Sequence, residues 1–317
     1  MEMLKFGPLV CNKSESTVGL ITPQWFFSKD DLLRSPSIQG GISYEKEQHL
    51  LRQAAAFVRV LAERMNDIPN ATKLTSLPIS VAIIQTRRFF LINRLTEFDP
   101  RDVVTAAAFL ASKSEECPRR LQDFVLCYYR LKVEIDCPKE DWDRNSRIDK
   151  KCYEQIAAYI VWIENLILQT IGFDLKVDVP HPFVLTMCKK FFPNEKAPAE
   201  IGYWLATDSL HMTDWSVRYK PETVACIVLF LMMLWKDVDI PNVEVDINGH
   251  RQRVPFFEAR CELSYDDMLN ILHEYTEIWK DNQANRLLAV EKFRDTEIRS
   301  RKFESPSSQS DREPGEI

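Results

Sequence analysis

The chain has 317 residues, a formal net charge of −6, 45% hydrophobic residues and 28% charged residues. This length allows two domains that each have a core, and the apolar content excludes a chain that is disordered throughout. The acidic balance argues against a general nucleic-acid-binding protein, because neutralising phosphates requires a basic surface.

The glycine content favours an all-α fold. The chain has eight glycines, and none lies between Ser43 and Ile171. Tight turns and left-handed helix caps favour glycine, so such a stretch is typical of helices joined by loops rich in proline, asparagine and aspartate.

Five helices are predicted in the first half of the chain, after a weakly patterned arm over residues 1–44 that is expected to be extended before the first helix. From Glu45 the apolar residues recur with the period of an amphipathic helix. Asp99 followed by Pro100 is typical of an N-cap with proline at the first helical position. The five helices are expected to begin near residues 45, 78, 100, 118 and 150.

A second helical set follows a stiff linker over residues 178–182. Gly172 followed by Phe173 is typical of the Schellman motif and ends the fifth helix. The sequence Pro-His-Pro in the linker disfavours helix, and Ser264 with Asp267 resembles a capping box. Helices are expected over residues 183–192, 198–212, 221–235 and 265–280, with a short piece near Pro255.

These elements predict an all-α protein of two five-helix bundles, with an N-terminal arm and a disordered C-terminal tail. The tail is charged after Asp281 and rich in serine, proline and glutamate from Ser305. The predicted divisions are the arm over 1–44, a first repeat over 45–178, a second repeat over 179–281 and a polar, partly helical tail over 282–317.

No pattern for catalysis, a metal or a cofactor is found in the sequence. The eight cysteines form no C-x-x-C pair, and the sequence holds no Walker A, G-x-S-x-G or H-E-x-x-H motif. A kinase's Gly-rich loop and Asp-Phe-Gly are also missing. We therefore expect a protein that is not an enzyme, with no catalytic residue, cofactor, metal or small-molecule substrate. The longest apolar run, residues 224–235, is too short to cross a bilayer and predicts a buried helix.

Three stretches of the first half resemble the cyclin box. Residues 107–121, AAFLASKSEECPRRL, are similar to its third helix, and residues 162–182, WIENLILQTIGFDLKVDVPHP, to its fifth helix and the linker after it. Residues 87–90, RRFF, match its second helix. The resemblance implies two tandem cyclin boxes of five helices each.

Three further stretches are most similar to the transcriptional cyclins of the cyclin T class. They are residues 25–37, 206–213 and 220–241. The resemblance implies a nuclear regulatory subunit that binds and activates a cyclin-dependent kinase as a heterodimer. The heterodimer would be positive transcription elongation factor b, whose kinase acts on the RNA polymerase II C-terminal domain. RNA polymerase II is thus an indirect partner, and neither a membrane nor nucleic acid is expected as one.

The resemblance also assigns residues that contact the kinase. Lys113 and Glu164 match a lysine and a glutamate that hydrogen-bond the backbone at the two ends of the kinase's regulatory helix. The apolar residues placed against the same helix are Leu110, Leu168, Phe173 and Leu175, with Glu116 as a secondary contact.

A purely structural role for each of these residues stays open. Lys113 near a helix C-terminus is favoured by the helix dipole alone, and Glu164 is equally consistent with a solvated carboxylate on a helix. The apolar residues, Leu110 among them, are equally consistent with an ordinary core.

Three other functions compete with the cyclin T interpretation: a cyclin K- or cyclin C-like subunit, a IIB-type DNA-binding transcription factor, and a helical scaffold without a kinase. A IIB-type factor predicts a basic surface and a zinc ribbon, which the acidic charge and unpaired cysteines do not favour. Residues 51–55 lack the substrate-docking sequence of cell-cycle cyclins. The His-rich tail of many cyclin T proteins is also missing, so tail-mediated recruitment of the polymerase is not expected.

Overall fold

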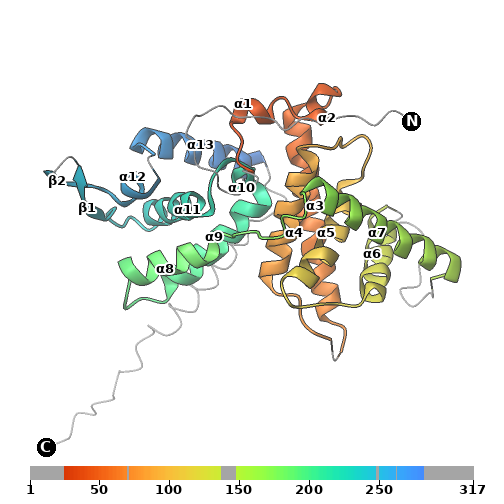
Figure 1. Cartoon of the computed structure of the whole chain (residues 1–317). Coiled ribbons are helices and arrows are strands. Elements are labelled where there is room, and N and C mark those ends of the chain that lie inside the picture. Colours follow the sequence, from red (N-terminus) through yellow and green to blue (C-terminus); the bar gives the residue numbers. More distant parts are fainter. Residues whose placement is uncertain (1–24, 70, 137–147, 248–249, 262, 282–317) are drawn as a thin grey trace, which may run out of the picture.

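Two helical bundles lie side by side in the computed structural model, which describes residues 25–69, 71–136, 148–247, 250–261 and 263–281 (Figure 1). The first part of the predicted arm, residues 1–24, and the predicted tail, residues 282–317, lie outside the described residues. The first bundle consists of α3 (Tyr44–Asn66), α4 (Ser76–Phe90), α5 (Pro100–Ser114), α6 (Leu121–Asp136) and α7 (Lys150–Thr170).

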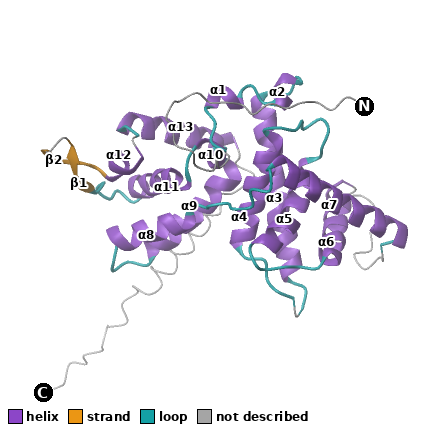
Figure 2. Ribbon diagram, in the orientation of Figure 1, coloured by secondary structure: helices purple, strands orange, loops and turns teal. Residues whose placement is uncertain are grey.

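The second bundle is helical except for one hairpin (Figure 2). Each bundle has its own core of buried apolar side chains. No helix of the described residues is long and apolar enough to cross a membrane. The elements of the second bundle are α8 (His181–Phe191), α9 (Ala197–Met212), α10 (Trp215–Arg218), α11 (Pro221–Trp235), β1 (Asn242–Ile247), β2 (His250–Pro255), α12 (Phe256–Cys261) and α13 (Tyr265–Asp281).

Helix α5 is the centre of the first bundle and packs on α3, α4 and α7. Its start confirms the predicted cap, since the Asp99 side chain accepts from the Arg101 N–H at 2.9 Å and Pro100 is the first helical residue. Alanines at the contacts, such as Ala107 and Ala111 (both 0% exposed), let neighbouring helices come close. This close packing fixes the position of the last turn of α5, which includes Lys113.

Helix α6 begins at Leu121, not at Pro118 as predicted. The residues before it form a loop because the Arg119 side chain turns inward. Its guanidinium donates to the carbonyl oxygens of Thr72 (2.6 Å) and Met65 (2.8 Å). The arginine therefore satisfies backbone acceptors near the end of α3, and the helix starts only after it.

Helix α7 ends in the predicted Schellman motif. The Phe173 N–H donates to the Leu168 carbonyl (2.9 Å), and the Gly172 N–H donates to the Gln169 carbonyl (3.2 Å). Gly172 has φ +60° and Phe173 has φ +61°. Two successive left-handed residues turn the chain sharply into the linker, although only the first is a glycine.

The second bundle is built around α11, whose residues 224–233 are all buried, which confirms the predicted core helix. Helices α8 and α9 approach closely at Gly202, where an added Cβ would lie 2.7 Å from Cγ1 of Val184. The predicted capping box of α13 is confirmed, because Ser264 Oγ accepts from the Asp267 N–H (3.1 Å) and the Asp267 carboxylate accepts from the Ser264 N–H (3.0 Å).

The all-α class is confirmed, and the second half also contains one β-hairpin that was not predicted. Strands β1 and β2 pair antiparallel with Val243 opposite Val254 and Glu244 opposite Arg253. Alternating valines before Asn248-Gly249, the dipeptide most typical of a two-residue hairpin turn, are the sequence signal that the helical interpretation missed.

The described part of the arm crosses both bundles and contains two short helices, α1 (Lys29–Leu32) and α2 (Pro36–Gln39), where an extended segment was predicted. Its Phe27 N–H donates to the Val217 carbonyl of α10 (2.8 Å), and the Leu95 N–H donates to Ser37 Oγ (3.0 Å). The arm thereby joins the second bundle to the first.

A partly buried network of polar and charged residues connects the two bundles. The Tyr44 hydroxyl of α3 donates to Asp214 (2.7 Å), and Arg218 bridges Asp214 (3.2 Å) to Glu274 of α13 (3.0 Å). Arg87 of α4 is 3% exposed and donates to Gln48 (3.1 Å). Burial lowers its pKa to about 10, and the Asp214 carboxylate opposes that shift.

Candidate protein-binding surface

The packing of α5 against α7 brings together the two charged residues singled out by the sequence. The Lys113 ammonium, on the last turn of α5, forms an ion pair with Oε1 of Glu164, in the middle of α7. The two side chains differ in exposure, 44% for Lys113 and 7% for Glu164. The lysine therefore remains open to further partners, whereas the carboxylate lies mostly beneath it.

The position of Lys113 is fixed by two further interactions. Its Nζ lies 4.1 Å from the centroid of the Phe109 ring, a cation–π contact. It also lies at the C-terminal end of α5, where the helix dipole favours a cation. Because an ammonium has three donors, Lys113 can bind Glu164 and still donate to a carbonyl of another protein.

The buried Glu164 carboxylate depends on the lysine. A carboxylate in an apolar setting is costly unless it is paired. Glu164 is 6% exposed overall, and it lies on the same helix among Ile160, Ile163 and Ile167, which belong to the core. The pair therefore has a structural role in addition to any role in binding.

Apolar side chains extend this site beyond Glu164. Leu168 follows Glu164 by one helical turn, so both lie on the same face of α7, and both Leu168 and Leu175 are half-buried against the first core. Phe173 is 67% exposed. We call Lys113, Glu116, Glu164, Leu168, Phe173 and Leu175 the α5–α7 surface.

The exposure of Phe173 is held by strained backbone. A left-handed conformation costs a residue with a side chain about 1–2 kcal/mol, and an exposed phenylalanine ring gains no burial in return. The conformation is held by the Schellman hydrogen bond of Phe173 and by the bond from the Leu175 N–H to the Phe173 carbonyl (2.9 Å). Strain combined with an exposed apolar ring is typical of a binding residue.

Leu110 and Glu116 differ in where the structure places them. Leu110 is 4% exposed and packs in the first core, so it lies beneath the α5–α7 surface. Glu116 is exposed, with φ +56°, just beyond the end of α5. It therefore presents a carboxylate to solvent close to Lys113.

Sequence reasoning missed the residues that hold Asp174, which follows Phe173 in the turn after α7. Asp174 accepts from the Trp25 indole Nε1 (3.2 Å) and pairs with Arg88, whose Nη1 lies 3.8 Å from its Oδ2. Arg88 also stacks over the Trp25 ring, 5.2 Å from its centroid. These residues come from the arm, α4 and the linker, and only the folded chain brings them together.

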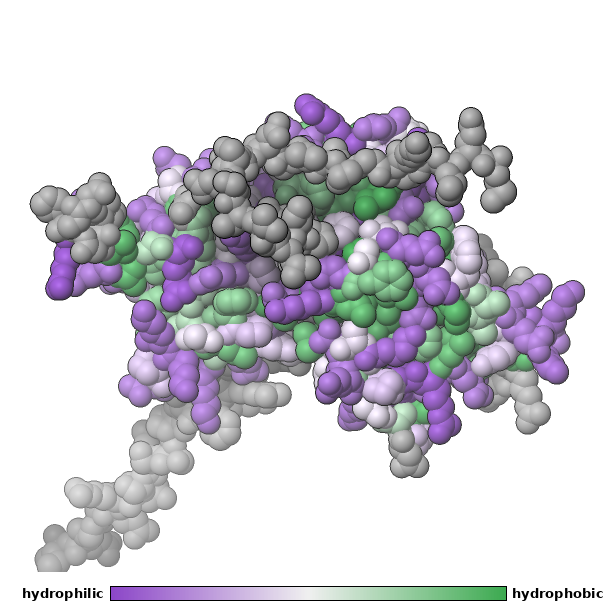
Figure 3. All heavy atoms as spheres, viewed as in Figure 1, coloured by the Kyte–Doolittle hydropathy of each residue, from purple (hydrophilic) through white to green (hydrophobic). Residues whose placement is uncertain are grey.

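Apolar and charged side chains alternate over the first bundle (Figure 3). The exposed large apolar residues of α7 and the turn after it are Tyr159, Trp162 and Phe173. Tyr159 and Trp162 stack with their ring centroids 5.7 Å apart. Because 3.6 residues make a helical turn, Trp162 lies on a different face of α7 from Glu164 and forms a separate patch.

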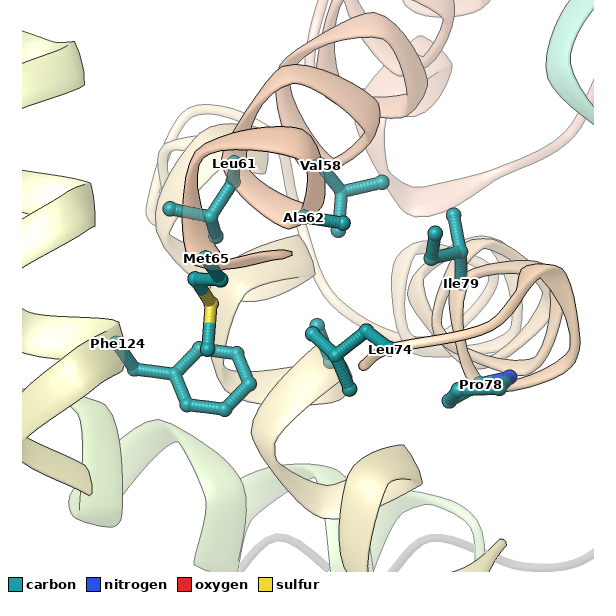
Figure 4. Close-up of a pocket in the computed structure, with 9 residues that line it drawn as sticks. Val58, Leu61, Ala62, Met65, Leu74, Pro78, Ile79 and Phe124 are labelled. Atoms are coloured by element: carbon teal, nitrogen blue, oxygen red, sulfur yellow. The ribbon is translucent and has the colours of Figure 1, made fainter. Parts of the chain in front are cut away.

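Two cavities in the described part of the chain are lined by residues outside the α5–α7 surface. A recess among α3, α4, α5 and α6 is lined only by apolar residues and has no space for a water-sized molecule (Figure 4). A cleft of about 680 Å³ between α3 and α13 is lined by Asp214, Arg218 and Glu274, which already pair with one another. Among the described residues, no group of three or more histidine, cysteine, aspartate or glutamate side chains is placed to hold a metal ion.

Two family models match the two bundles in turn. Residues 42–176 match the cyclin N-terminal domain, and residues 179–252 match the cyclin-T2-like C-terminal domain. The boundary between the matches falls in the linker that joins α7 to α8.

Several curated relatives are cyclin T proteins. The chain is 32% identical to Cyclin-T1.1 of Caenorhabditis elegans over 226 residues, covering 70% of this chain and 46% of the relative. It is 32% identical to human Cyclin-T1 over 274 residues, covering 86% of this chain and 34% of the relative. The chain thus spans less than half the length of these relatives.

Solved structures share the fold at low sequence identity. A chain of the crystal structure of the yeast RNA Pol II CTD kinase CTDK-1 complex matches with TM-score 0.60 and 17% identity, over 91% of this chain and 86% of that one. A chain of the CAK complex of Chaetomium thermophilum bound to ATP-gamma-S matches with TM-score 0.51 and 15% identity, over 92% of this chain and 95% of that one. Both matches extend across the two bundles.

Proposed function

The chain belongs to the cyclin family, and from this premise we propose that it is the regulatory subunit of a transcriptional cyclin-dependent kinase. The kinase is of the elongation type, positive transcription elongation factor b. The heterodimer acts in the nucleus and phosphorylates the C-terminal domain of RNA polymerase II. The chain itself binds the kinase and does not take part in the phosphoryl transfer.

The observation that carries this proposal is the composition of the α5–α7 surface. Every helix leaves backbone N–H groups unpaired at its start and carbonyl groups unpaired at its end. Lys113 supplies donors, and Glu164, whose Oε1 pairs with Lys113, has Oε2 as an acceptor. Together they match the two kinds of unpaired group on a partner helix. Phe173, Leu168 and Leu175 offer apolar area beside them, worth about 25 cal/mol per Å² buried.

Activation follows from holding one helix of the kinase. In a protein kinase, a glutamate of the regulatory helix must pair with the lysine that positions ATP. A partner that binds only the inward position of that helix increases its population. The ion pair between Lys113 and Glu164 orders these two side chains in the unbound chain. Less conformational entropy is therefore lost when the kinase binds.

The relatives support the class of partner. Curated relatives that match most of this chain are named cyclin T. One solved structure with the same fold is described as an RNA Pol II CTD kinase complex. The cyclin T names of the curated relatives favour the elongation-type kinase over the cyclin K- and cyclin C-like alternatives.

The test is to co-express the chain with catalytic subunits of the elongation type and of the types that pair with cyclin K and cyclin C. We expect the elongation-type subunit to co-purify and to phosphorylate a peptide of RNA polymerase II C-terminal repeats. Lys113→Glu should abolish both results. Lys280→Glu is the matched control, because it breaks an exposed ion pair with Glu277 (2.7 Å) on α13. Co-purification with none of these subunits contradicts the proposal.

A further inference from the structure

A tryptophan of the arm contacts the turn that carries Phe173. The indole Nε1 of Trp25 donates to Oδ2 of Asp174 (3.2 Å), a residue 149 positions further along the chain. Asp174 directly follows Phe173. Trp25 is 7% exposed and belongs to the first core. The hydrogen bond therefore connects the turn after α7 to the core through a residue that is distant in sequence.

Arg88 of α4 approaches the same carboxylate oxygen. Its Nη1 lies 3.8 Å from Oδ2 of Asp174, which is beyond hydrogen-bond distance. Its guanidinium lies over the Trp25 ring, 5.2 Å from the centroid. A guanidinium whose side chain is only 9% exposed is unfavourable without a paired carboxylate. The ion pair therefore attracts Asp174, whereas the shorter, directional bond from Trp25 sets the orientation of the carboxylate.

The backbone hydrogen bonds of this turn are local and connect it only to α7. The Phe173 N–H donates to the Leu168 carbonyl (2.9 Å), and the Asp174 N–H donates to the Ile171 carbonyl (3.1 Å). The end of a helix opens more readily than its middle, and the left-handed φ of Phe173, +61°, adds strain to this end. The bond from Trp25 comes from another part of the fold, so it resists such opening.

The residues after Trp25 hold the arm on the second bundle. The Phe27 N–H donates to the Val217 carbonyl of α10 (2.8 Å), and the Lys29 ammonium pairs with Glu274 of α13 (2.9 Å). Trp25 itself packs in the first core. The position of the indole is therefore set by contacts with both bundles.

We propose that Trp25 is a positioning residue for the α5–α7 surface. Its indole N–H holds Asp174, and through the backbone this bond keeps Phe173 in the left-handed conformation that exposes the ring. Trp25 is buried, so it acts through Phe173 and not by contact with the kinase. The inference rests on the proposed function, because the kinase is the partner that the exposed ring would bind.

The expected effect on affinity follows from the population of the ordered turn. A protein that adopts its binding conformation only part of the time binds with an affinity reduced by that fraction. Without the indole N–H, the turn should leave this conformation more often. We therefore expect kinase binding to weaken roughly three- to tenfold, which is less than the loss expected when the Phe173 ring itself is removed.

The first experiment measures hydrogen exchange in the chain alone. Trp25→Phe keeps an aromatic ring beside Arg88 and removes the donor. We expect the backbone amides of Phe173 and Asp174 to exchange about tenfold faster, while amides in the middle of α7 and α11 keep their rates. Trp279→Phe, at a 43% exposed position on α13, is the matched control and should leave both turn amides unchanged. Unchanged turn amides in Trp25→Phe would overturn the proposal.

The second experiment titrates each variant with the elongation-type kinase subunit. Trp25→Phe should weaken binding in the unmodified background and change it little in the Phe173→Gly background, because the ring that it positions is then absent. Additive losses would show that Trp25 acts independently of Phe173 and would overturn the proposal. If the unmodified chain binds no kinase, the proposed function fails, whereas the exchange rates still decide whether Trp25 holds the turn.

A measurement on the unmodified chain covers the case in which Trp25→Phe does not fold. The indole N–H of Trp25 and the backbone N–H of Phe173 should be protected from exchange to a similar extent, because one opening of the turn releases both. An indole N–H that exchanges freely while the Phe173 amide stays protected would overturn the proposal.

Discussion

The ammonium of Lys113 and the nearly buried carboxylate of Glu164 form an ion pair that joins the last turn of α5 to the middle of α7. This pair connects folding with the proposed binding, because the same two groups stabilise the first bundle and present opposite polarities to a partner. The two roles make different predictions and can be separated by experiment.

Exchange of the two charges should separate the structural role from the binding role. Lys113→Glu places a second carboxylate beside buried Glu164 and should lower the free energy of unfolding by roughly 1–3 kcal/mol, since one partner is half-exposed. The double variant Lys113→Glu with Glu164→Lys restores an ion pair and should recover much of that loss in urea denaturation. It should not recover kinase binding in a pull-down, because the donor and acceptor have changed places. Recovery of both properties would show that the pair is only structural.

Phe173 should show opposite effects on stability and binding. Phe173→Gly removes the strain of the left-handed conformation and should stabilise the chain by up to about 1 kcal/mol. It also removes a ring that is 67% exposed and available to a partner. Loss of about 1.5–3 kcal/mol of burial should weaken kinase binding by one to two orders of magnitude, measured by titration. Unchanged affinity would remove Phe173 from the proposed surface.

Leu110 and Leu168 should differ in what their truncation changes. Leu110→Ala opens a cavity in the core around a side chain that is 4% exposed, and should cost about 2–5 kcal/mol of stability. Leu168→Ala, at a half-buried position, should cost less stability and weaken kinase binding directly. Thermal melting and a binding titration on each variant check this difference. Equal stability losses would contradict the burial of Leu110.

Acid should weaken the second bundle through His181. Burial lowers the pKa of this imidazole from 6.5 to about 4, so below pH 6.5 the unfolded chain binds a proton that the folded chain does not. The stability contribution is complete above pH 6.5 and is lost as the pH falls towards 4. Between pH 7 and pH 5 His181 should account for about 2 kcal/mol of the loss, measured by urea denaturation of the chain and of His181→Asn. The variant should keep a shallower dependence, because the pKa of the buried His211 is also lowered, to about 3; an unchanged slope would contradict the prediction.

Most of the helices follow from local sequence. The N-cap at Asp99, the Schellman motif at Gly172 and the capping box at Ser264 are confirmed, because each depends on residues within a few positions of one another. The start of α6 was predicted too early, because the inward turn of Arg119 is set by carbonyls near the end of α3. The hairpin was missed, although Asn248-Gly249 signalled it.

The sequence by itself determined the helical class, two helical repeats and the cyclin family, because helical period, capping residues and family motifs are properties of short segments. Only the tertiary structure decided that Lys113 pairs with Glu164, that Leu110 is buried while Phe173 is exposed, and that Trp25 and Arg88 both bind Asp174. Those relationships join residues far apart in the chain, and whether such residues meet depends on how the helices pack. A helical pattern gives the direction of a side chain around its own axis, but not which other helix lies beside it.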